Sequence, residues 1–155
     1  MRRPLPTGTW DDAPPEKVRV LVECPPEHTP DVIAGILERN GYAVRTCEGP
    51  DKRHHCPLVT TGSCNLVSGA DVVVNLFGGS NPHTSEVLTA ITDERRPPAV
   101  VTEVPAPEIQ RRDDYDNWWF DRGRVHIVES PLTTATLLAA IESTLTTTQR
   151  TNRQA

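Results

Sequence analysis

Strand patterns alternate with helical patterns along the middle of the chain, and this alternation constrains the fold more than any other feature. The segment Asp71–Phe77 is almost continuously apolar, which is typical of a parallel strand buried on both faces. Further strand-like segments lie at 18–22, 43–46, 99–104 and 124–128, and apolar residues recur at helical spacing in 29–40, 85–95 and 133–145. Five strands separated by helices predict an α/β domain with a five-stranded parallel sheet of order 2-1-3-4-5 and helices on both faces.

The two ends of the chain lack this pattern. Residues 1–16 are rich in proline and poor in apolar side chains, and Trp10 is the one residue there suited to dock on the domain or on a partner. Residues 146–155 are polar. We therefore expect a disordered N-terminal arm over 1–16, a folded α/β domain over 17–145, and a disordered C-terminal tail over 146–155.

Charge and hydropathy exclude several classes of function. The chain has 16 basic and 21 acidic residues, a net charge of −5, and no concentrated basic segment, which argues against nucleic acid as its main partner. No apolar run approaches the ~20 residues of a membrane span, and no apolar stretch follows Arg2 and Arg3 as in a signal peptide. We expect a cytoplasmic protein whose four cysteines are thiols, metal ligands or redox groups rather than structural disulfides.

Three segments resemble the receiver domain of bacterial response regulators. Residues 18–44 read as strand, acidic turn, helix and a Gly-Tyr-x-Val step, and residues 99–102 resemble the fourth receiver strand with its switch threonine, here Thr102. Ser130-Pro131-Leu132 resembles the Lys-Pro turn before the last helix. The resemblance covers roughly residues 18–145 and implies a flavodoxin-like fold with a cis peptide at Ser130–Pro131.

The chain departs from receivers at the residues that carry phosphorylation. Glu23 and Cys24 stand where receivers have two acids that hold Mg²⁺, Asn75 stands at the phosphorylated aspartate, and Ser130 replaces the lysine. An amide cannot form the acyl phosphate that a carboxylate forms. The resemblance therefore implies a degenerate pseudo-receiver: a signalling module that binds proteins, is not an enzyme and needs no cofactor.

The four cysteines support an alternative. Cys24 and Cys47 end strands that neighbour each other in the expected order, and Cys56 and Cys64 lie in the loop that follows. We expect all four to converge at one edge of the sheet, where four thiolates suit Zn²⁺ or an iron–sulfur cluster. The spacing contains no Cys-x₂₋₄-Cys pair, so buried or free thiols and a Cys56–Cys64 disulfide stay open beside the metal or redox module.

A second alternative depends on one glutamate. Asn81-Pro82 followed by Glu86, with Asp71 upstream, loosely resembles nucleoside deoxyribosyltransferase-like and TIR-like proteins, and this implies that Glu86 attacks a sugar carbon. A glutamate in the first turn of a helix is also favoured by the helix dipole alone, so an exposed, structural Glu86 is the competing interpretation.

An acidic and aromatic segment, residues 113–120, precedes the fifth expected strand. It contains Tyr115, Trp118 and Trp119, and tryptophan and tyrosine are enriched in the residues that dominate protein interfaces. One tryptophan can cover the edge of a core, but two adjacent ones are hard to bury together. The segment therefore predicts a partner-binding surface for another protein or for a second copy of this chain.

Overall fold

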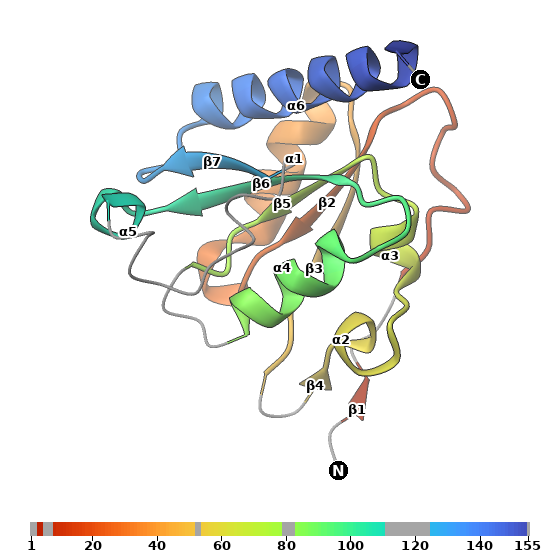
Figure 1. Ribbon diagram of the computed structural model, residues 1–155, viewed down its shortest axis with the longest axis vertical. Helices are drawn as coiled ribbons and strands as arrows, with labels where there is room; N and C mark the ends of the chain where they lie inside the picture. Colours follow the sequence, from red (N-terminus) through yellow and green to blue (C-terminus); the bar gives the residue numbers. More distant parts are fainter. Residues whose placement is uncertain (1–2, 5–7, 52–53, 79–82, 111–124, 155) are drawn as a thin grey trace.

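The computed structural model describes residues 3–4, 8–51, 54–78, 83–110 and 125–154. Its centre is a parallel sheet of β2 (Arg19–Glu23), β3 (Ala43–Cys47), β5 (Val72–Asn75), β6 (Ala99–Val104) and β7 (Val125–Glu129). The strands lie side by side in the order β3-β2-β5-β6-β7 (Figure 1). Numbered along the chain, these five strands have the order 2-1-3-4-5, so the predicted fold class is confirmed.

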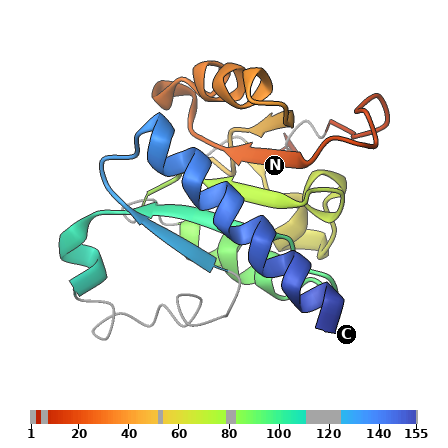
Figure 2. The same ribbon diagram turned by 90° about the horizontal axis from the view of Figure 1, so that it is seen from above.

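Helices cover both faces of the sheet. One face packs against α1 (Pro30–Arg39) and α6 (Thr134–Gln154), and Figure 2 shows α6 running diagonally over the sheet. The other face packs against α2 (Pro57–Thr61), α3 (Asn65–Ser68) and α4 (Thr84–Thr92). The short helices η1 (Pro26–His28) and α5 (Ala106–Gln110) follow β2 and β6 at the carboxyl edge of the sheet.

Successive residues of each strand enter different hydrophobic layers. Leu21, Val73 and Val100 belong to the layer beneath α2, α3 and α4. Their neighbours belong to the layer beneath α1 and α6: Val20, Val22, Val72, Val74 and Val101. Because side chains alternate along a strand, the face of the sheet that each strand-end residue occupies is set by this register.

The N-terminal segment differs from the expected disordered arm, because its described part packs on the domain. The Trp10 side chain is 5% exposed, and its Nε1–H donates a 2.9 Å hydrogen bond to the Leu66 carbonyl. The guanidinium carbons of Arg19 and Arg45 lie 5.8 and 5.3 Å from the centre of the indole ring, within cation–π range. Burial of this large ring offsets the entropy lost when the segment is ordered.

The ends of the chain also form secondary structure that was not expected from the sequence. Strand β1 (Arg3–Pro4) pairs in parallel with β4 (His54–His55) and forms a small sheet below the main one in Figure 1. Helix α6 continues to Gln154, through nine of the residues assigned to a disordered tail. Its packed first turns, which include Leu137 and Ile141, supply the nucleus from which a helix extends at little cost per residue. No helix within the described ranges is both long and apolar enough to cross a bilayer.

Candidate functional site

Four side chains form a row across the carboxyl ends of four strands. Glu23 is the register partner of Cys47 on one side and of Asn75 on the other, and Asn75 is the partner of Thr102. Glu23, Asn75 and Thr102 each lie two residues beyond Leu21, Val73 and Val100 respectively, so they share the face covered by α2, α3 and α4. All three are buried, with Glu23 only 3% exposed. Ligands of parallel α/β sheets bind at this edge, so we take this row as the candidate site.

Glu23 and Asn75 form a buried hydrogen-bonded pair. Asn75 Nδ2 donates to Glu23 Oε1 over 3.0 Å, and Asn75 Oδ1 accepts a 3.4 Å hydrogen bond from the Phe77 backbone N–H. Both ends of the amide are therefore engaged. Burial raises the pKa of Glu23 to about 7, against a smaller lowering by the Asn75 hydrogen bond. The carboxyl therefore keeps its proton to a higher pH than an exposed glutamate does.

Two residues of the expected degenerate pocket lie outside this row. Cys24 follows Glu23 by one residue and enters the opposite layer, beneath α1 and α6, where its thiol contacts the carbonyls of Pro25 and His28 at 3.5 and 3.6 Å. Ser130 precedes a cis peptide to Pro131, and its backbone N–H donates to the Val104 carbonyl at 3.1 Å. The structure thus brings together Glu23, Asn75 and Thr102 and replaces Cys24 in that group with Cys47.

The expected convergence of four cysteines is corrected to three. Cys47, Cys56 and Cys64 belong to the layer beneath α2, α3 and α4, whereas Cys24 lies across the sheet. Cys24 does end a strand beside Cys47, with a 2.9 Å bond from its N–H to the Cys47 carbonyl. Alternation along β2, however, sends its side chain to the other face.

All four cysteines are free thiols, and burial favours the protonated form of Cys24, Cys47 and Cys56. Burial, with a smaller contribution from Glu23, raises the pKa of Cys47 to about 12, and burial also raises the pKa of Cys56. Burial and the nearby Glu27 raise the pKa of Cys24 to about 11. Among the residues that the structure describes, which include all four cysteines, no three His, Cys, Asp or Glu side chains are placed to hold a metal ion. Binding of Zn²⁺ or an iron–sulfur cluster therefore stays a prediction without a formed site.

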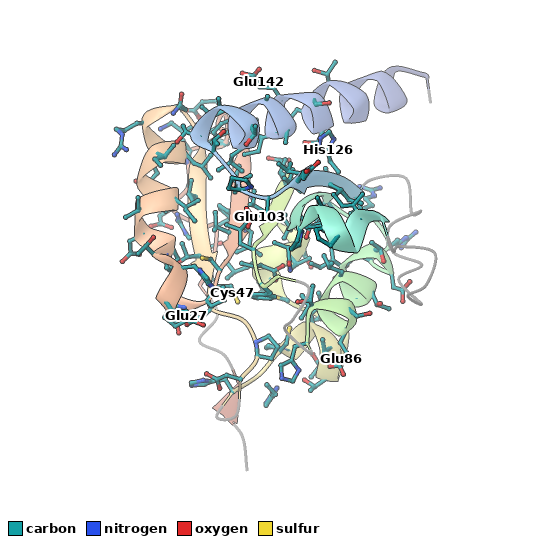
Figure 3. All side chains as sticks on the ribbon, turned by 90° about the vertical axis from the view of Figure 1, so that its left-hand side faces the viewer. Glu27, Cys47, Glu86, Glu103, His126 and Glu142 are labelled. Carbon is teal, nitrogen blue, oxygen red and sulfur yellow. The ribbon has the colours of Figure 1, made fainter. Side chains whose placement is uncertain are left out.

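Glu86 lies away from the row. It occupies the first turn of α4 as an exposed side chain, with Oε2 3.8 Å from His83 Nδ1 (Figure 3). This is the placement expected of a structural glutamate at a helix N-terminus.

The residues predicted to bind a partner, Tyr115, Trp118 and Trp119, lie outside the described residues.

A cavity of about 460 Å³ lies across the sheet from the row. It opens at the carboxyl edge between α1 and α6, where Figure 3 labels Glu103 in the middle of the molecule. Its walls come from four stretches of chain, 28–36, 76–78, 103–105 and 130–137, and include Ile33, Ile36, Leu76, Ser130 and Leu137. Periodicity assigns the helical members of this set to the core, and no local signal marks the space that they leave.

Comparison with known proteins identifies the fold. No family model and no curated protein matches the chain. Among solved structures, a response regulator receiver domain protein from Clostridium thermocellum superposes with a TM-score of 0.63 at 18% identity, over 85% of this chain and 97% of that one. The non-phosphorylated HemR receiver domain from Leptospira biflexa gives 0.59 at 15% identity, over 83% and 94%. NtrX from Brucella abortus, in complex with ADP, gives 0.64 at 19% identity, over 88% of this chain but 29% of NtrX.

The chain has the fold of a receiver domain. The resemblance predicted from its sequence is therefore confirmed at the level of fold. On this receiver-like chain, the strand ends that the resemblance associates with magnesium and phosphate carry the neutral amide of Asn75 and the buried carboxyl of Glu23. The cis peptide that the resemblance implied is present at Ser130–Pro131.

Proposed function

We propose that this protein is a receiver-like regulatory module that acts by binding a protein and is not switched by phosphorylation. The observation that carries the proposal is the Glu23–Asn75 pair, which is buried and hydrogen-bonded at the strand ends where receivers carry their reactive acids. The receiver fold supports the regulatory role.

The chemistry of the pair opposes both steps of receiver phosphorylation. The Asn75 amide is a poor nucleophile, and its two ends are already held by Glu23 and the Phe77 backbone. Mg²⁺ prefers accessible, ionised oxygen ligands, whereas Glu23 is buried with a pKa raised to about 7. Ser130 also provides no positive charge to pair with a phosphoryl group.

Protein binding is supported by the aromatic segment of the sequence. A domain without a reactive acid transmits a signal through the partners that it contacts, and Tyr115, Trp118 and Trp119 supply the side chains that dominate many protein interfaces. The partner is either a different protein or a second copy of this chain.

The proposal is tested by incubating the protein with acetyl phosphate and Mg²⁺, with a phosphorylatable receiver domain treated in parallel. We expect the control to gain a phosphoryl group in its intact mass and this protein to gain none. Its elution volume in size-exclusion chromatography is expected to be the same with and without acetyl phosphate. A phosphoryl group that hydroxylamine removes from this protein would overturn the proposal.

A further inference from the structure

The cavity between α1 and α6 has an apolar wall built by both helices. Ile33 and Ile36 contribute from α1 and Leu137 contributes from α6, while Leu76 and Leu132 close the sides from loops after β5 and β7. Its volume of about 460 Å³ lies within the ~300–1,000 Å³ range of small-molecule sites. The position, outside the carboxyl ends of parallel strands, is also the usual one for ligands of this architecture.

One carboxylate gives this cavity its polar character. Glu103 lies one residue beyond the row position Thr102, so its side chain faces the α1 and α6 layer. Its Oε2 accepts a 2.6 Å hydrogen bond from the Leu132 backbone N–H, and its Oε1 has no hydrogen-bond partner among the described residues. Among the described lining residues, Glu103 alone carries a formal charge when histidine is neutral.

The start of α6, which also borders the cavity, is already capped. The Thr133 N–H donates to Thr136 Oγ1 over 2.9 Å, and the Thr136 N–H donates to Thr133 Oγ1 over 3.1 Å. These reciprocal bonds satisfy two of the donors that an anion at a helix N-terminus would otherwise use. The Glu103 carboxylate, whose Oε1 accepts no hydrogen bond from the described residues, favours a ligand that donates hydrogen bonds and carries positive charge.

We propose that this cavity binds a small molecule with an apolar body and a protonated amine, and that the amine pairs with Glu103. The apolar body lies against Ile33, Ile36 and Leu137 and removes their exposed surface from water. A carboxylate in an apolar surrounding forms a stronger pair with an ammonium group than one in bulk water does. The site lies across the sheet from the Glu23–Asn75 pair, so it does not depend on the proposed protein-binding function.

Three probes that share an indole ring test this proposal: tryptamine, the neutral alcohol tryptophol and the anion indole-3-acetate. Binding is followed through the backbone amide signals of the ¹⁵N-labelled chain. We expect tryptamine to shift signals of residues 33–37, 76–78 and 130–137, and to bind about tenfold more tightly than tryptophol, as a hydrogen bond between charged groups implies. Indole-3-acetate is expected to bind more weakly than either.

Substitutions of lining residues test separately the negative charge of Glu103 and the volume of the cavity. Glu103→Gln keeps an acceptor for the Leu132 N–H but removes the charge, so it is expected to weaken tryptamine about tenfold and leave tryptophol unchanged. Ile36→Trp fills the cavity and is expected to abolish binding of both tryptamine and tryptophol. Ile33→Trp is a second variant that fills the cavity, and circular dichroism checks that each variant is folded. Val32→Trp is the matched control on the same helix, because Val32 is 58% exposed and does not line the cavity.

Each contrary result overturns the proposal. The first two are that tryptamine does not bind at its solubility limit, or that it shifts only signals of residues away from the cavity. The third is that tryptamine and indole-3-acetate bind with equal affinity. The fourth is that a folded Glu103→Gln variant binds tryptamine as tightly as the wild type does. None of these results bears on whether the protein accepts phosphate, so failure of this proposal is distinct from failure of the proposed function.

Discussion

Replacing Glu23 by glutamine is expected to change how the stability of the protein depends on pH. Glutamine keeps an oxygen that accepts the hydrogen bond from Asn75 Nδ2, but it carries no titratable proton. The substitution therefore removes the ionisation of a buried carboxyl and leaves its neighbours in place. The free energy of unfolding of the variant, compared with that of the wild type at several pH values, measures the cost of this ionisation.

The sign and size of the effect follow from the raised pKa. The folded chain holds the Glu23 proton up to a pKa of about 7, whereas the unfolded chain releases it near the ordinary value of 4.5. The proton thus stabilises the fold fully below pH 4.5, and this stabilisation is lost as the pH rises towards about 7. At about 1.4 kcal/mol for each pH unit, the loss amounts to about 3 kcal/mol. Wild type and Glu23→Gln are expected to be about equally stable at low pH, and the variant about 3 kcal/mol more stable above neutral pH.

Urea unfolding followed by circular dichroism between acidic and mildly alkaline pH provides the measurement. Glu27→Gln is the matched control, since Glu27 is exposed and the same change of side chain is then made outside the buried row. Using differences between wild type and variant removes the contributions of titratable groups that the two proteins share. A constant difference between wild type and Glu23→Gln across this range would refute the buried, proton-holding role of Glu23.

Two further predictions concern tryptophans. Trp10→Ala is expected to lower the free energy of unfolding by about 3 kcal/mol or more, because it removes a buried ring and the hydrogen bond to Leu66. Trp10→Phe, which keeps an aromatic ring, is expected to lower it by less. Urea unfolding measures both variants, and a loss below about 1 kcal/mol for Trp10→Ala would contradict the packing of the N-terminal segment. Replacing both Trp118 and Trp119 by alanine is expected to weaken self-association or partner binding, seen by light scattering or co-purification, without changing the circular dichroism spectrum; full retention of the complex would count against the aromatic surface.

The main sheet and its longer helices were predictable because their strands and helices carry local signals of the correct period. The apolar run at 71–77 is typical of a strand covered on both faces, and the helices at 29–40 and 133–145 showed single apolar stripes. Right-handed crossovers then leave few ways to arrange five parallel strands. The end segments were harder to predict, because the order of residues 8–16 depends on a groove for Trp10 that is formed by distant residues, among them Leu66 and Gly69.

The candidate site, like the fold, was predictable in part from the sequence. The sequence alone determined that Glu23, Cys47, Asn75 and Thr102 end strands at one edge, and that an amide stands where a receiver has its phosphorylated aspartate. Only the tertiary structure decided which face each residue occupies: one step along β2 separates Glu23 from Cys24 and places them in different layers. The physical reason is that successive side chains of a strand point to opposite faces of a sheet. The position of a residue at a strand end determines the edge of the sheet at which it lies, whereas the register and the covering helices determine which side chains surround it. The burial that raises the Glu23 pKa, and the cavity beside Glu103, arise from segments that meet only when the chain is folded.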